Sequence, residues 1–123
     1  IHRKKMKIYF KEGKNTAFWE GVKSGSKTHT CRKRAAKVGA ALSLICGGET
    51  VNVTCTGVQR FSTEPAPYGP IALVDGAVLP PKTVAAFARR SGFRDIPAMF
   101  DYYGESFDGY INHWGQDFYE SIY

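Results

Sequence analysis

Residues 25–32 read Gly-Ser-Lys-Thr-His-Thr-Cys-Arg, and the rest of the chain can be interpreted around this stretch. A glycine-containing turn leads into residues that favour an extended strand. Lys27, Thr28, Thr30 and Arg32 place two cations and two hydroxyl groups within six residues. Such a cluster can hold an anion or activate a hydroxyl, and the alternative interpretation is a solvated edge strand. The surrounding sequence decides between these alternatives.

Length and composition predict one folded domain over residues 1–123. The chain has 123 residues, of which 43% are hydrophobic and 23% charged, as is usual for globular proteins. We expect residues 1–5 to be a tag or a flexible arm, and residues 116–123 to be an acidic, aromatic tail. No apolar run reaches the length of a membrane span, and the basic N-terminus lacks the apolar segment of a secretory signal, so we expect no membrane association.

The charge is distributed unevenly along the chain. Residues 1–37 contain 12 Lys/Arg and two acids, whereas the region from residue 101 onward contains five acids and no Lys or Arg. This polarity predicts a basic face that attracts phosphate groups, with RNA, single-stranded nucleic acid or a nucleoside as the partner. The alternative is that the basic segment and the acidic tail pack together and neutralise each other.

The cysteines indicate a reducing, cytoplasmic setting. There are three, Cys31, Cys46 and Cys55, with no Cys-x-x-Cys spacing, which argues against a disulfide framework and a structural zinc site. His29 and Cys31 could ligate a metal as a pair, but no second pair lies nearby in the sequence. We therefore expect no metal and no cofactor.

Hydrophobic periodicity predicts an α+β domain with five to six strands and about three helices. The expected strands cover residues 7–10, 41–46, 51–58, 71–74 and 110–114, and the expected helices cover residues 16–23, residues 81–90 and a short segment capped by Asp95. Strands 41–46 and 51–58 should form a hairpin. Residues 62–81, rich in Pro and Gly, are expected to form a long irregular connection around one small strand.

The order of these features resembles the ASCH domain, a small relative of the PUA domain. The matching positions are Gly25, Lys27, Thr28, Thr30, Arg32, Gly39, residues 51–58, the Gly92-Phe93 pair, Met99 and residues 107–114. The resemblance covers about residues 7–115. It implies a PUA-like mixed β-barrel with a cleft beside the motif, and a role in binding RNA or an unpaired or modified base.

One branch of this family removes the acyl group of N4-acetylcytidine with a Lys, a Thr and a Glu. By motif these roles fall to Lys27 and Thr30, whereas the position of the Glu is occupied by Ser91. The family's common Gly-Asp pair is also altered here, to Gly39-Ala40. The resemblance therefore implies either a binding domain or a hydrolase, of the amidohydrolase or ribonuclease kind, that lacks one expected acid.

The catalytic alternative makes specific demands on Lys27 and Thr30. A Lys acts as a base for a Thr hydroxyl only when burial lowers its pKa. Two residues three apart on a regular strand face opposite sides, so the turn before the motif must place Lys27 outside the strand. Glu64, Asp75 and Asp95 are the acids that could replace the missing Glu, and their spacing selects none of them.

Nucleic-acid binding requires a less exact arrangement of groups than catalysis does, and more residues could contribute to it. The expected contacts to nucleic acid are Lys27, Thr28, Thr30, Arg32, Lys33, Arg34, Arg90, Tyr102 and Trp114. The cations would meet phosphates and the aromatic rings would stack on bases, and the alternative for each ring is that it belongs to the core. A third hypothesis is an interaction domain that recruits a protein through the acidic, aromatic tail.

Overall fold

The computed structural model describes residues 5–11 and 17–119, and the expectations for residues 1–4, 12–16 and 120–123 lie outside this part of the chain. In chain order the elements are β1 (Lys5–Tyr9), α1 (Phe18–Ser24), β2 (His29–Arg32), β3 (Ala41–Cys46), β4 (Glu49–Thr54), β5 (Gly57–Glu64), β6 (Ile71–Val74), β7 (Ala77–Val78), α2 (Pro81–Ser91), α3 (Ile96–Tyr103) and β8 (Asp108–His113). The α+β class and the three expected helices are confirmed.

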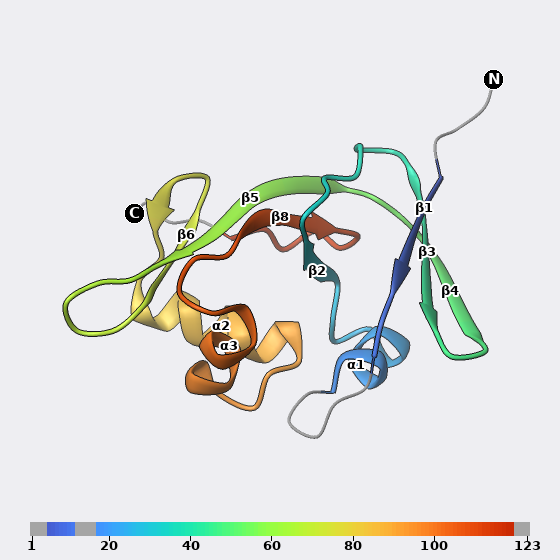
Figure 1. Cartoon of the computed structure of the whole chain (residues 1–123). Helices are drawn as coiled ribbons and strands as arrows, with labels where there is room; N and C mark the ends of the chain where they lie inside the picture. The colour runs from blue at the N-terminus through green and yellow to red at the C-terminus, as the bar shows by residue number, and fades with distance from the viewer. Residues whose placement is uncertain (1–4, 12–16, 120–123) are drawn as a thin grey trace.

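The eight described strands form two sheets. One has the order β1-β3-β4 and the other β2-β8-β5-β6-β7. β1 runs parallel to β3, whereas the remaining pairs are antiparallel, including the predicted β3–β4 hairpin. Neither sheet closes on itself over the described residues, so the expected closed barrel of five or six strands is not what these strands form. Figure 1 shows β5 arching over α2 and α3, with α1 near β1 and β3.

The expected strand at residues 51–58 is interrupted, and this interruption produces the second sheet. Cys55 still donates its backbone N–H to Ala40, the residue before β3 of the first sheet, whereas Thr56 donates to His113 in β8 of the second. The chain therefore changes sheets between two neighbouring residues. It continues as β5, of which residues 57–58 belonged to the expected strand and residues 62–64 to the expected irregular connection.

The helices end where local signals predicted. Gly25 and Gly92 follow α1 and α2 in the left-handed conformation, with φ of 86° and 102°, which favours glycine. Pro81 begins α2, where its missing N–H costs nothing. The Asp95 side chain caps α3 by accepting a hydrogen bond from the N–H of Ala98 at 2.9 Å. None of these described helices is both long and apolar enough to cross a membrane.

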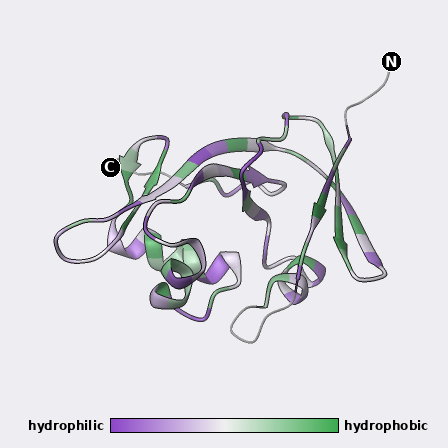
Figure 2. Ribbon diagram, in the orientation of Figure 1, coloured by the Kyte–Doolittle hydropathy of each residue, from purple (hydrophilic) through white to green (hydrophobic). Residues whose placement is uncertain are grey.

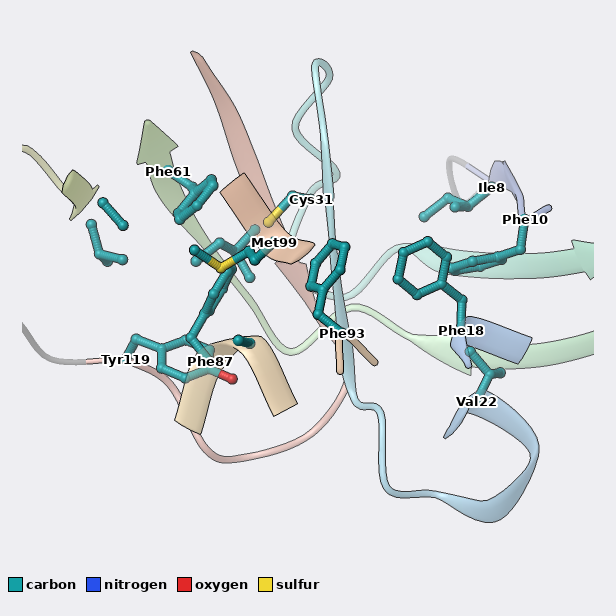
Figure 3. Packing of buried hydrophobic residues seen from close by; sticks show 14 of the residues in the cluster. Ile8, Phe10, Phe18, Val22, Cys31, Phe61, Phe87, Phe93, Met99 and Tyr119 are labelled. Atoms are coloured by element: carbon teal, nitrogen blue, oxygen red, sulfur yellow. The ribbon is translucent and has the colours of Figure 1, made fainter. Parts of the chain in front are cut away.

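The core lies between the sheets and the helices. Figure 3 shows Phe61, Phe87, Met99 and Tyr119 on one side and Ile8, Phe10, Phe18 and Val22 on the other, with Phe93 between the two groups. The Phe93 ring centre is 5.3 Å from that of Phe18. β5 is mixed in character, with two runs of polar residues beside its hydrophobic ones, and its ribbon in Figure 2 carries both hydrophilic and hydrophobic colours. One continuous apolar cluster therefore joins both sheets to α1, α2 and α3.

Candidate anion-binding site

The turn after α1 brings Lys27 back against the helix before β2 begins at His29. The backbone N–H of Lys27 donates to the carbonyl of Gly21 at 2.9 Å. A Cβ atom on Gly21 would lie 2.9 Å from the Cβ of Lys27, so the close approach requires glycine at this position. Lys27 thus lies outside the regular strand, as the sequence required.

The Lys27 side chain is buried and its amine contacts Ser91. Nζ donates a hydrogen bond to the Ser91 carbonyl oxygen at 2.8 Å and lies 5.1 Å from the centre of the Phe18 ring. Burial lowers the pKa of Lys27 to about 7, and the nearby Arg32 guanidinium acts in the same direction. The amine therefore changes charge near neutral pH, where an ordinary lysine stays charged.

Ser91 also binds His29, through its hydroxyl. The His29 Nε2 and Ser91 Oγ atoms are 3.0 Å apart, and both residues are about 1% exposed. Burial holds the pKa of His29 well below its usual range, and the Lys27 and His113 side chains lower it further. His29 is therefore neutral at physiological pH. The position that resemblance assigned to a Glu does lie beside Lys27, and it carries a serine.

A cavity of about 620 Å³ lies over Lys27 between α1 and the end of α2. Its charged lining residues are Glu20, Lys27, Arg89, Arg90 and Arg94, and Ser24 and Ser26 add two hydroxyl groups. The Nε of Arg94 is 3.3 Å from a carboxylate oxygen of Asp95. Over the described ranges, no Asp or Glu carboxylate lies within ion-pair distance of Arg89 or Arg90. The cavity therefore combines a buried amine with the exposed guanidinium groups of Arg89 and Arg90.

Sequence reasoning missed Glu20 as a residue of this cavity. Glu20 forms an ion pair with Lys23 at 3.3 Å on the exposed face of α1. The three acids that the sequence offered lie elsewhere, because Glu64 and Asp75 line a separate cavity of about 690 Å³ and Asp95 caps α3. The salt-bridge spacing of Glu20 and Lys23 was visible in the sequence, but it predicts a solvated helix face rather than a site.

The Lys27 amine contacts Ser91, whereas the Thr30 side chain does not face Ser91. His29 faces His113 in the β2–β8 pairing, and the two ring centres are 5.6 Å apart. Thr30 pairs with Asn112, whose side chain bonds to backbone groups of Arg34 and Ala36 on the other side of the sheet. Strand alternation therefore turns the buried Thr30 side chain away from Ser91.

The basic run after the motif is largely used by the fold itself. Arg32 donates to the carbonyls of Tyr9 at 2.8 Å and Cys31 at 3.1 Å, and its guanidinium is 4.9 Å from the centre of the Phe10 ring. Lys33 donates to the Asp108 carbonyl at 3.2 Å. Arg34 is exposed and borders a different cavity of about 110 Å³.

The remaining candidates differ in where they lie. The exposed Arg90 lines the main cavity, and its guanidinium is 5.8 Å from the centre of the Tyr119 ring. Tyr102 is 56% exposed and its ring packs against Phe93 and Phe18, at 5.4 and 5.5 Å between ring centres.

Thr28 and Trp114 are joined by their backbones and do not line the main cavity. The N–H of Trp114 donates to the Thr28 carbonyl at 2.8 Å, and both residues are half-buried. Across residues 5–11 and 17–119, no three His, Cys, Asp or Glu side chains gather as metal ligands.

Comparison of the chain with protein-family models, with curated proteins and with solved structures gives no match.

Proposed function

We propose that this domain binds nucleic acid or a nucleotide in the cavity between α1 and α2. The single observation that carries the proposal is the meeting of Lys27 with Arg89, Arg90 and Arg94 around one cavity. These cations come from two segments more than 60 residues apart in the chain. Guanidinium groups suit phosphate oxygens because they donate two hydrogen bonds in a plane. The exposed ring of Tyr102, packed on Phe93 at the same end of the domain, would offer a base a surface for stacking.

We further propose that the two sheets are an opened variant of a PUA-like barrel, as the resemblance to the ASCH domain implies. The order of elements supports this assignment: α1 precedes the motif strand β2, and β8 ends the described fold beside it. Arg32 ties β2 to β1 across the gap between the sheets. The three free thiols support a reducing, cytoplasmic setting.

Binding is tested by fluorescence anisotropy with labelled single-stranded RNA, single-stranded DNA and a labelled nucleotide at low salt. We expect Arg89→Ala to weaken binding by about tenfold, as removal of one charge-assisted contact implies. Arg34→Ala is the matched control, since it removes the same charge outside the cavity. If no ligand binds at low salt, or if the two variants weaken binding equally, the cavity is not the binding site.

A hydrolase of acylated nucleosides, or a ribonuclease, is the second candidate, and the lowered pKa of Lys27 supports it. An amine with a pKa of about 7 can act as a general base at neutral pH. Glu20 is the acid that lines the same cavity, whereas Thr30 faces the other side of β2. The geometry therefore supports a base in the cavity better than it supports the Lys27–Thr30 pair.

Turnover of N4-acetylcytidine and of RNA, measured at high enzyme concentration, tests this candidate. A genuine activity should disappear in Lys27→Met and survive in Thr30→Val, which removes only the hydroxyl. Activity lost in Thr30→Val but retained in Glu20→Gln would instead restore the Lys–Thr mechanism. An inactive wild-type protein would leave binding as the proposed function.

A further inference from the structure

Some cations of this domain form hydrogen bonds within the fold, whereas others line the cavity. Which cations are left for a ligand bears on the shape of the ligand that can bind. An extended nucleic-acid strand needs a row of free cations that follows its backbone. Arg32 and Lys33, which would begin such a row beside the motif, donate instead to the carbonyls of Tyr9, Cys31 and Asp108. Arg60 forms a pair of hydrogen bonds to the carboxylate of Asp108.

Two cations that stay available lie together at the cavity beside Lys27, whereas Arg34 and Lys37 border the separate cavity of about 110 Å³. Arg89 and Arg90 are exposed and, over the part of the chain that the structure describes, have no carboxylate within ion-pair distance. They line the same cavity as Lys27. Its volume of about 620 Å³ falls within the range of roughly 300–1,000 Å³ that is usual for small-molecule sites.

Resting on the proposed function, we propose that this cavity binds a single phosphomonoester, carried by a free nucleotide or by the end of a strand, rather than the backbone of an extended strand. The exposed Arg89 and Arg90 guanidiniums would hold the phosphate oxygens. The Lys27 amine would lie beneath it. Glu20, on the α1 side of the cavity, would accept a hydrogen bond from an amino or hydroxyl group of the same ligand.

Binding of the phosphomonoester should be coupled to the uptake of a proton by the Lys27 amine. A phosphomonoester is largely a dianion above pH 7, because its second pKa is about 6. A dianion near Nζ favours the charged ammonium, so an amine that is mostly neutral at pH 8 should take up a proton when the ligand binds. The ionisable groups packed around Lys27 or lining its cavity are Glu20, His29, Cys31, Arg32, Arg89, Arg90 and Arg94. Of these, His29 is neutral at that pH and the Cys31 thiol has a pKa of about 11, so neither supplies the proton.

The test compares ligands that differ only in the terminal phosphate. Calorimetric titrations at pH 8 would use cytidine and cytidine 5′-monophosphate, and a hexanucleotide with a 5′-hydroxyl or a 5′-phosphate. We expect the phosphate to increase affinity at least about tenfold in one pair or both. A gain for the mononucleotide alone identifies a free nucleotide as the source, and a gain in both pairs includes strand ends.

Variants then assign the effect to the cavity. Arg89→Ala should abolish the advantage of the phosphate, whereas Arg34→Ala, with the same loss of charge, should retain it. Titrations in two buffers of different ionisation enthalpy should show proton uptake in the wild type and none in Lys27→Met. If the 5′-hydroxyl hexanucleotide binds as tightly as the phosphorylated one and neither mononucleoside form binds, the inference is wrong and the proposed function stands. If none of the four ligands binds, both fail.

Discussion

The Nζ atom of Lys27 and the carbonyl oxygen of Ser91 are joined by a buried hydrogen bond of 2.8 Å across 64 positions of sequence. This contact fixes the motif segment against the end of α2. Among residues 5–11 and 17–119 no carboxylate forms an ion pair with the amine, and burial lowers its pKa. Stability and binding should therefore both depend on the protonation of Lys27.

The free energy of unfolding should rise with pH just above neutrality. The pKa of Lys27 is about 7 in the folded protein and 10.5 by its usual value, so between these values the unfolded chain binds a proton that the folded chain lacks. Stability increases with pH under this condition, by at most about 1.4 kcal/mol per pH unit. Urea unfolding at pH 7.5 and 8.5 should show a rise of about 1 kcal/mol in wild type relative to Lys27→Met.

Ionisation of Cys31 sets the highest pH at which this stability measurement reports on Lys27. Burial raises the pKa of its thiol from 9.0 to about 11, so stability falls again once the unfolded thiol ionises. Measurements at or below pH 8.5 avoid that effect. Equal pH slopes for wild type and Lys27→Met would contradict a lowered lysine pKa.

Acidification should destabilise the fold through His113. Burial lowers the pKa of His113 from 6.5 to about 4, so the unfolded chain gains a proton first as the pH falls between these values. We expect His113 to contribute a loss on the order of 2 kcal/mol between pH 6.5 and 4.5, which His113→Gln should lack, while His29, whose pKa is also lowered, adds to the loss in both proteins. Because Asp95 and Asp108 have pKa values below 3.8, they contribute to acid unfolding only at lower pH. Identical acid titrations of the two proteins would exclude His113 as the cause.

Replacement of Arg32 should weaken the attachment of β1 more than it weakens ligand binding. Arg32→Ala removes two hydrogen bonds, to Tyr9 and Cys31, and a contact with the Phe10 ring. We expect a loss of about 1–2 kcal/mol, with faster hydrogen exchange in β1. Arg34→Ala should change stability by less than about 0.5 kcal/mol. If Arg32→Ala instead abolishes binding while β1 stays protected, Arg32 contacts the ligand directly.

Tyr119, which lies in the first half of the expected tail, should contribute to stability as a core residue does. Tyr119 is buried, and its ring centre lies 4.9 Å from that of Phe87 and 5.2 Å from that of His29. The Gln59 side chain also bonds to both the N–H and the carbonyl of Tyr119. Tyr119→Ala should therefore cost about 3 kcal/mol in thermal or urea unfolding, whereas Tyr119→Phe retains the ring. An unchanged midpoint for Tyr119→Ala would show that residues 116–119 are available to a protein partner.

Local sequence signals were sufficient for elements whose stabilising contacts are also local. β3 and β6 have the predicted bounds, and α2 and α3 begin at their Pro and Asp signals. β5 was largely missed because polar residues interrupt its hydrophobic alternation. Those residues are stabilised by distant partners, since Arg60 binds Asp108 and Gln59 binds His113.

The site was predictable to the same extent. The turn at Gly25 correctly allowed Lys27 to lie outside the strand, and resemblance directed attention to Ser91. The positions of Glu20 and Arg32 depend on how α1 and β1 pack against the motif, and no spacing in the sequence reports that packing. The charge distribution of the sequence predicted a basic surface. It did not show that Arg32 and Lys33 would donate hydrogen bonds to backbone carbonyls of the fold.

The contacts of Ser91 restrict which substitutions this fold can tolerate at that position. Its carbonyl oxygen binds Lys27 while its hydroxyl binds His29, in a space with almost no solvent exposure. A glutamate introduced here would remove the small hydroxyl partner of a neutral imidazole and place a larger carboxyl group in the same space. Ser91→Glu alone should therefore be strongly destabilising, and a second change that makes room at His29 should be needed before the carboxylate is tolerated. The two positions are thus expected to be epistatic, so that a gain of the missing acid depends on the order in which substitutions accumulate.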